Sequence, residues 1–374
     1  MRINKILILV LMISVPPLSA SFGQIVYNQP YSASLNFYYN SWSLDNQLAG
    51  GSEDFSQRTF SLSGFMPLRD NFEARYSIVT ASNTLDMNNT ENELSGVGDL
   101  RVQFSHSFYS DRVLLSAGVN LPTGKQELDT GQELQVIEFL SRDYLSFPVR
   151  RYGEGTGFNL LAGGATSLGP VKCGATASYY YTGTYTPYAE FGDYNPGNTF
   201  SVGGSAELTS DRIHYSAQLS YSISGTDQLD GDDIYKQADR FTTYLAASYN
   251  EQPYMVTAGT RIILRGENTR YSITDGAIES KLKKYGDEFD IFLHLDYSAA
   301  ESWLLGARLA TRQISSGEEA MDRASIYSFG LSVSRKLSDH YRANLGGIYH
   351  TGSTDQNDIS LSGFQMTASL SAAY

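Results

Sequence analysis

Residues 289–297 read Phe-Asp-Ile-Phe-Leu-His-Leu-Asp-Tyr, with an apolar side chain at every second position. Successive side chains of a β-strand point to opposite faces, so the odd-numbered residues of this stretch form one apolar face. The even-numbered residues, two aspartates and a histidine among them, form a largely polar opposite face. Similar alternation recurs along most of the chain in stretches of roughly ten residues, which is the length of a membrane-crossing strand.

The N-terminal residues have the pattern of a cleavable signal peptide. Two basic residues precede an apolar run over residues 6–15, and small residues follow it. Cleavage after Ala20 or Gly23 fits the small-residue preference of signal peptidases. The run is shorter than the roughly 20 residues of a spanning helix, and an uncleaved anchor is the alternative. We predict a signal peptide over residues 1–23 and one secreted domain over residues 24–374.

Short polar turns alternate with longer polar segments along this domain. Seven tight turns lie at 67–71, 109–112, 167–170, 209–212, 250–253, 298–301 and 337–340. Eight longer segments lie at about 44–56, 81–95, 122–154, 183–197, 225–236, 266–285, 315–321 and 352–358. Such alternation is typical of an all-β, antiparallel transmembrane β-barrel with short periplasmic turns and long outer loops. We predict about sixteen strands, with fourteen as the alternative count and a soluble β-sandwich as the alternative fold.

The composition is that of an acidic, tyrosine-rich secreted chain. The net charge is −13, and there are 27 tyrosines. Without a basic stripe, nucleic acid is not expected as a partner. Tyrosines favour the two interfaces of a membrane, and the lone Cys173 excludes an internal disulfide. We therefore predict location in the bacterial outer membrane, with outer-membrane lipid as a partner.

The last predicted strand carries a second signal related to the membrane. Phe364, Met366, Leu370 and Tyr374 share one face of this strand, and the sequence closes on the aromatic residue. This pattern resembles the C-terminal signal that the outer-membrane barrel assembly machinery reads, although Phe is its usual final residue. We expect that machinery to be a partner as well.

Charged residues of the strands follow the polar register. A basic side chain on the lipid face would cost about 2–4 kcal/mol at the bilayer midplane, so these residues should face the lumen. The strand residues that we single out as lumen or constriction candidates are Asp99, Arg101, Arg261, Asp290, Arg308 and Arg312. They form either a mutually paired ladder around a hydrated interior, which we favour, or a selectivity zone for a charged or polar solute.

The longest loop, residues 122–154, is the third outer loop in this assignment. Apolar residues between Leu134 and Leu140 recur at helical spacing. In sixteen-stranded general porins the third loop folds into the barrel and narrows it. By analogy, the loop residues that are candidates for a constriction are Glu133, Glu138, Arg142 and Asp143. An external flap is the alternative.

Catalytic, metal-binding and cofactor-binding motifs are lacking in the sequence. The five histidines are dispersed, and none forms a pair at metal-ligand spacing. No Gly-x-Ser-x-Gly motif or phosphate-binding loop occurs. We predict no catalytic residues, no metal site, no cofactor and no enzymatic activity.

One local pattern resembles a known family. Residues 96–102 read Gly-Val-Gly-Asp-Leu-Arg-Val, and Leu-Pro-Thr-Gly-Lys follows at 121–125. This order resembles the outer-membrane transporter family labelled for the meta-pathway of phenol degradation, which implies passage of small, often aromatic compounds. Gly96 and Gly98 would let the strand bend or a loop approach closely, and Asp99 would project into the lumen.

The leading functional hypothesis is an outer-membrane channel or facilitator for small solutes, aromatic or hydrophobic ones included. Neither a plug domain nor an energy-coupling segment is evident in the sequence. A structural or surface-interaction barrel without transport is the alternative, and an outer-membrane enzyme that modifies lipid or glycan is a second one. Conductance across a planar bilayer separates the first hypothesis from the other two.

Overall fold

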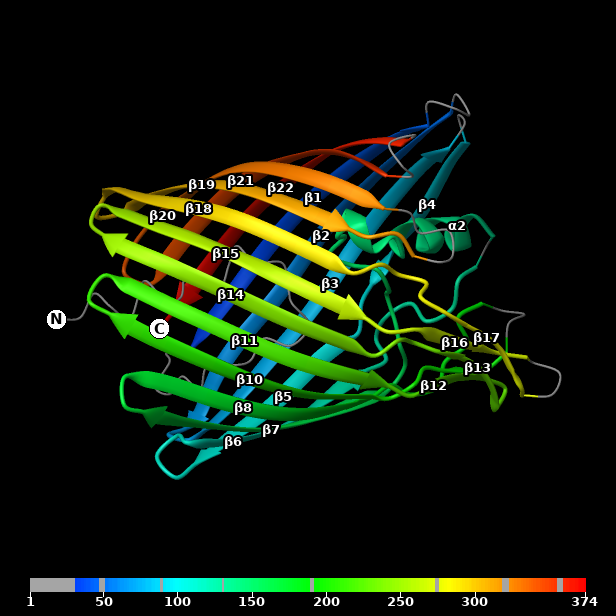
Figure 1. Ribbon diagram of the computed structural model, residues 1–374, viewed down its shortest axis with the longest axis horizontal. Coiled ribbons are helices and arrows are strands. Elements are labelled where there is room, and N and C mark those ends of the chain that lie inside the picture. The colour runs from blue at the N-terminus through cyan, green and yellow to red at the C-terminus, as the bar shows by residue number, and fades with distance from the viewer. Residues whose placement is uncertain are drawn as a thin grey trace.

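The computed structural model describes residues 31–46, 51–87, 90–129, 131–188, 192–272, 276–317, 323–354 and 359–374. The predicted signal peptide and its cleavage site lie outside these residues. Within them, sixteen antiparallel strands form one closed barrel (Figure 1). The first and last strands close it, with pairs running from Ser32↔Ala373 to Asn46↔Ile359. The predicted fold class and strand number are confirmed, and the count of fourteen is wrong.

The wall strands follow one another in chain order, and β4 and β5 together make one of the sixteen. Their bounds are β1 (Ser32–Asn46), β2 (Gly51–Arg69), β3 (Phe72–Met87), β4 (Thr90–Val97), β5 (Leu100–Phe108), β6 (Val113–Leu121), β7 (Gly157–Leu168), β8 (Val171–Tyr181), β10 (Thr199–Ser210), β11 (Ile213–Ser224), β14 (Arg240–Glu251), β15 (Tyr254–Arg265), β18 (Glu288–Ala300), β19 (Trp303–Ile314), β20 (Ala324–Lys336), β21 (Tyr341–Thr354) and β22 (Ile359–Ala373). Figure 1 places the short turns and the C-terminus at one rim, where Tyr374 N–H donates to the Tyr31 carbonyl (2.8 Å).

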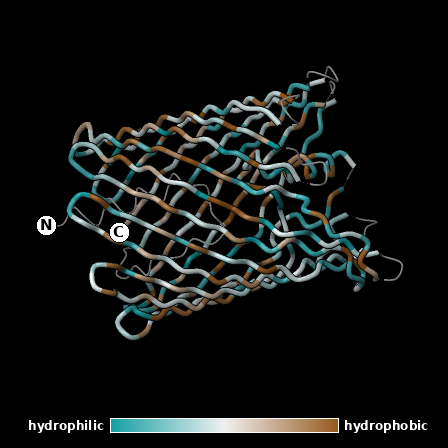
Figure 2. The backbone as a smooth tube through the Cα atoms, viewed as in Figure 1, coloured by the Kyte–Doolittle hydropathy of each residue, from teal (hydrophilic) through white to brown (hydrophobic). Residues whose placement is uncertain are grey.

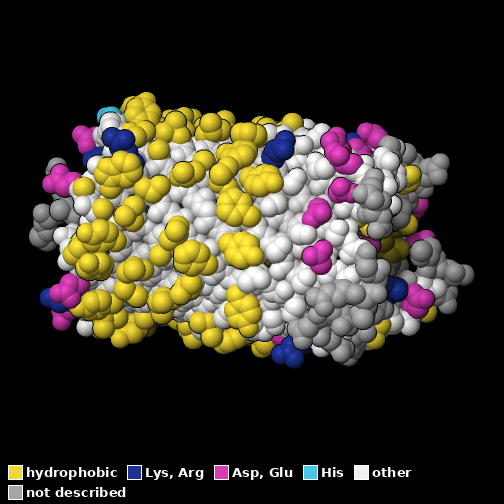
Figure 3. Space-filling model, turned by 90° about the horizontal axis from the view of Figure 1, so that it is seen from above, with side chains coloured by type: hydrophobic (Ala, Val, Ile, Leu, Met, Phe, Trp, Pro, Cys, Tyr) yellow, Lys and Arg dark blue, Asp and Glu magenta, His cyan; other side chains and the backbone are white. Residues whose placement is uncertain are grey.

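The outer face of the wall is apolar, as the alternation predicts. On β18, Phe289, Ile291, Leu293 and Leu295 are all 40–47% exposed. The hydropathy colours alternate along the strands (Figure 2), and hydrophobic side chains cover the part of the surface nearer the short turns (Figure 3). Among the described residues, no helix is both long enough and apolar enough to span a bilayer.

The predicted strand ends are wrong on the long-loop side of the first hairpins. The predicted outer loop at 81–95 is mostly strand, because β3 continues to Met87 and β4 begins at Thr90. The physical reason is inward packing: Leu85 and Leu94 are fully buried in a cluster with residues of the long loop. This hairpin therefore stands above the apolar band as a support for that loop.

Three further predicted outer loops, at 183–197, 225–236 and 266–285, also contain strands. These strands build a separate five-stranded sheet at the long-loop rim (Figure 1). Its strands are β9 (Tyr194–Asn195), β12 (Thr226–Leu229), β13 (Asp232–Lys236), β16 (Asn268–Tyr271) and β17 (Ile278–Leu282). These strands are short and mostly polar, so they carry no apolar alternation from which they could be predicted.

A bulge separates β4 from β5 at Gly98 and Asp99. Thr80 pairs with Val97 before it, and Ser77 pairs with Arg101 after it, which is a shift of one residue in register. Gly98 N–H donates to the Val79 carbonyl (2.7 Å), and a Cβ at Gly98 would lie 2.8 Å from Val79 Cγ1. The bulge therefore requires glycine here, as β-bulges often do, and it turns Asp99 toward the interior.

Candidate functional site

The long loop after β6 packs on the inner face of the wall. Its helix α2 (Gly131–Leu140) buries Val136, Phe139 and Leu140, and a short 3₁₀ turn (Asp143–Leu145) follows. The Phe139 ring stacks on Phe55 of β2 with centroids 4.6 Å apart and planes 6° apart. Phe55 lies in the register opposite the exposed Phe60 and is itself 2% exposed. The loop thus covers a patch of the interior surface.

Asp99 ties the two ends of this loop together. Its Oδ1 accepts the Gly124 N–H (2.9 Å), and its Oδ2 accepts the Glu154 N–H (2.8 Å) and the Asn120 amide (2.8 Å). Gly124 is needed for the close approach, since a Cβ there would lie 2.2 Å from the Tyr152 carbonyl oxygen. We call Asp99, Asn120, Gly124 and Glu154 the Asp99 clamp. Charge-assisted bonds to backbone N–H groups are among the stronger hydrogen bonds in proteins.

A second set of buried polar contacts holds the returning half of the loop. Gln57 donates to the Val149 carbonyl (2.7 Å) and accepts the Val149 N–H (3.2 Å), so it pairs with the loop backbone as a strand would. The Tyr152 hydroxyl lies 3.2 Å from the carbonyl oxygens of Ala81 and Leu94. Burial raises the pKa of Tyr152, although a hydrogen bond with Asn83 opposes the shift, so the phenol remains a neutral donor.

The middle of the loop reaches the far side of the barrel. Arg312 on β19 donates to the Tyr144 carbonyl (3.4 Å) and to the Ser146 hydroxyl, and Arg265 on β15 pairs with Asp143 (3.6 Å). β3 is the third and β15 the eleventh of the sixteen wall strands, so they lie on opposite sides. The loop therefore crosses the interior from β2–β4 to β15–β19.

The structure brings several of the predicted site residues together. The Asp290 carboxylate accepts hydrogen bonds from Arg261 Nε (2.7 Å) and Arg312 Nε (3.2 Å). Glu288 pairs with both Arg261 and Arg265, and Arg265 pairs in turn with Asp143 of the loop. The Arg261 and Arg312 side chains are 17% and 21% exposed, as expected for paired charges in a partly hydrated interior.

The remaining predicted residues lie elsewhere on the same inner surface. Arg101 approaches Glu154 of the Asp99 clamp (3.9 Å), and Arg308 lies on β19 directly across from His294. Glu133 pairs with a lysine at the start of the loop. Arg142 pairs with a glutamate of β2 and covers the Phe139 ring. The Glu138 side chain is exposed on α2 and joins none of these groups.

Sequence reasoning missed Gln57, Asn83 and Tyr152, although all three are central to how the loop is held. Gln57 and Asn83 occupy the inward register of their strands, but a polar inward residue is ordinary in any barrel. The neighbouring sequence does not distinguish an inward polar residue that binds a distant loop from one that faces water. Gln57, for example, binds Val149, which lies 92 residues further along the chain. The two halves of the motif at 96–125 meet in the structure, where Asp99 accepts the Gly124 N–H and so holds the start of the loop.

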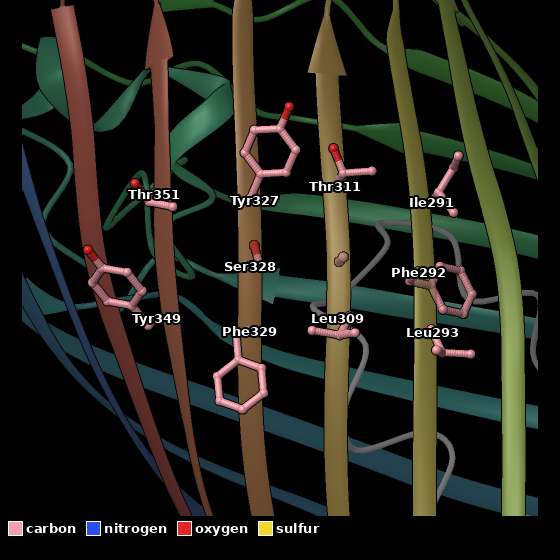
Figure 4. Close-up of a pocket in the computed structure, with 11 residues that line it drawn as sticks. Ile291, Phe292, Leu293, Leu309, Thr311, Tyr327, Ser328, Phe329, Tyr349 and Thr351 are labelled. Atoms are coloured by element: carbon pink, nitrogen blue, oxygen red, sulfur yellow. The ribbon is translucent and has the colours of Figure 1, made fainter.

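One hollow of the described wall lies on its outer face. A groove of about 430 Å³ runs over β18–β21 between Ile291, Leu309, Thr311, Tyr327 and Tyr349 (Figure 4). These side chains belong to the outward register, and most of them are half exposed. Figure 4 shows them projecting from the wall with α2 behind it. The groove therefore faces lipid acyl chains and is not part of the interior.

Among the residues that the structure describes, no three His, Cys, Asp or Glu side chains are grouped so that they could hold a metal ion.

Comparison with known proteins yields matches at the level of the fold. No protein-family model matches the chain, and no curated protein matches it in sequence. Matching solved structures include the CymD monoaromatic hydrocarbon channel (12% identity, 92% of this chain and 89% of that one, TM-score 0.45). A Pseudomonas aeruginosa FadL homologue is 11% identical over 92% of this chain and 90% of that one, with a TM-score of 0.44. Pseudomonas aeruginosa OpdL is 10% identical over 92% of this chain and 98% of that one, with a TM-score of 0.49.

The structure itself defines the class of protein. A closed sixteen-stranded wall has no free edge, its outer face is apolar, and its inner face carries charge. Among β-sheets, only a closed one satisfies all of its backbone hydrogen bonds within a membrane. The chain is a porin-like transmembrane β-barrel of the outer membrane.

Proposed function

We propose that this barrel is a channel or facilitator for small solutes and that the loop 122–154 is its constriction. The observation that carries the proposal is the loop crossing the interior between two anchored sides, the Asp99 clamp on one and Arg265 with Arg312 on the other. A barrel that only presents a surface to a partner would not require a loop fixed across its own lumen. Two contacts support this proposal at the far wall: Asp143 of the loop pairs with Arg265, and Arg312, which also pairs with Asp290, donates to the loop backbone.

The solute class that we propose is small aromatic or hydrophobic compounds, passed without energy coupling or chemical change. The resemblance of residues 96–125 to the phenol meta-pathway transporter family supports this choice. The place of that motif in the fold supports it too, because Asp99 and Gly124 hold the constricting loop. Insertion by the barrel assembly machinery is part of the same proposal.

Conductance across planar bilayers tests the proposal. The purified wild-type barrel should form channels, and deletion of residues 128–148 should raise the single-channel conductance. That deletion removes α2 and the crossing segment but spares the Asp99 clamp and every wall strand. A barrel that conducts nothing would refute the channel, and an unchanged conductance would refute the constriction. Liposome swelling with aromatic acids, sugars and amino acids then ranks the solutes.

A further inference from the structure

Arginines gather in the interior of this barrel although the whole chain carries a net charge of −13. Eight arginines follow the inner wall and the crossing loop: Arg101, Arg150, Arg151, Arg240, Arg261, Arg265, Arg308 and Arg312. Four carboxylates lie among them: Asp143, Glu154, Glu288 and Asp290. We call this set the arginine belt. Asp287, which accepts the Arg265 N–H (2.8 Å), lies at the edge of the belt and pairs with Lys283.

On the far side of the barrel, ion pairs connect the wall arginines to the loop. On the wall, Arg261 and Arg265 both pair with Glu288, the first at 3.4 Å. Asp143 of the loop then joins Arg265 (3.6 Å) to Arg150. These ion pairs therefore extend from the wall onto the loop 122–154.

Beside the Asp99 clamp, arginines again pair with a shared carboxylate, but at longer distances. Glu154 lies 3.5 Å from Arg151 and 3.9 Å from Arg101, so one carboxylate faces two arginines. The side chains of Arg101 and Arg151 are 62% and 58% exposed. Exposed pairs at such distances are weakly held, which leaves these guanidinium groups accessible to a solute.

Arg240 adds a further guanidinium at the far end. It lies directly across from Arg265 in the β14–β15 ladder, on the inward register opposite the exposed Phe241. Within the described parts of the chain, its guanidinium has no hydrogen bond and no carboxylate within ion-pair distance. Asp143 and Glu288 both pair with Arg265, and no carboxylate pairs directly with Arg240 among the described residues, so a small anion can approach the Arg240 guanidinium.

We propose that the arginine belt is a binding zone for small aromatic carboxylates, an inference that rests on the proposed channel function. Guanidinium groups are always charged and bind a carboxylate through two parallel hydrogen bonds. Tyrosine rings supply a surface for the aromatic part: the Tyr180 hydroxyl donates to Glu154 (3.3 Å), and Tyr185 packs edge-on against Tyr194 (5.6 Å). Rings of fixed charge select ions by sign in other pores.

Reversal potentials in a KCl gradient at low ionic strength test the charge preference. The wild-type barrel should favour chloride. Removing one unit charge at roughly 6 Å from an ion in water should lower its local concentration about threefold, so R151Q and R240Q should each reduce the chloride preference by up to that factor. R151K should retain it. R212Q is the matched control, because Arg212 lies in a short turn at the opposite rim and pairs with Glu251.

Block of the current by benzoate and by benzyl alcohol tests the ligand class, because the two share a ring and differ in charge. Benzoate should block at lower concentration, and R151Q and R240Q should weaken its block about threefold each while leaving benzyl alcohol unchanged. Heat-modifiable migration on gels verifies that each variant is folded.

The outcomes separate the two proposals. If no variant or wild-type barrel conducts, the channel function itself fails. If the barrel conducts but prefers cations, shows no preference, or is blocked by benzyl alcohol at a lower concentration than by benzoate, the belt inference is overturned and the channel stands. Chloride preference that persists unchanged in R151Q and R240Q would also overturn it.

Discussion

Replacing Asp99 with asparagine should release the long loop from the wall without unfolding the barrel. The carboxylate accepts three hydrogen bonds, from Gly124 N–H (2.9 Å), Glu154 N–H (2.8 Å) and the Asn120 amide (2.8 Å). In its better orientation an asparagine keeps the two bonds at the Oδ2 position and turns an NH₂ toward the Gly124 N–H. Losing one charge-assisted bond and leaving a buried donor unsatisfied costs about 2–4 kcal/mol.

That loss should appear as faster proteolysis inside the loop. Trypsin can cleave after Arg142, Arg150 and Arg151 only when the loop leaves the wall, so cleavage follows the population of the open loop. A loss near 3 kcal/mol should raise the cleavage rate of D99N on the order of 100-fold. The sixteen wall strands stay paired, so heat-modifiable migration should not change.

A matched control is available at the opposite rim. Asp111 lies in a short turn and accepts a single hydrogen bond from Ser107 (2.8 Å), which an asparagine oxygen can also accept. D111N should therefore be cleaved at the wild-type rate. Equal cleavage rates for D99N and the wild type would show that Asp99 does not hold the loop, and the clamp argument would be wrong.

The other predictions concern the same loop and the last strand. Phe139→Ala removes a stacked, buried ring and should loosen α2 by about 3–5 kcal/mol, seen as noisier channel currents. Gly124→Ala places a Cβ 2.2 Å from the Tyr152 carbonyl and should expose the loop to trypsin, whereas Gly131→Ala, with open space around it, should not. Tyr374→Ala should lower the yield of folded barrel in cells and Tyr374→Phe should preserve it; equal yields would argue against a terminal assembly signal.

Much of the wall could be predicted from the sequence because its cause is local. The alternation at 289–297 places Phe289 and Ile291 outside and Asp290 inside, whatever the neighbouring strands are. The turns at 109–112 and 209–212 depend on residues within a few positions of each other. Helical spacing in the long loop likewise predicted a helix near 134–140, where α2 lies.

Only the tertiary structure decided what the inward residues do. Asp99 contacts residues 25 and 55 positions away, and Arg312 contacts a residue 166 positions away, so no window of sequence contains both partners. The extension of β3 and β4 had the same origin, since Leu85 and Leu94 are buried by a loop that follows them. The sequence by itself determined a membrane barrel, because lipid on one side and water on the other act on every strand alike. Closure of that barrel decided which charges meet across it, because only closure brings β5, the loop and β19 around one space.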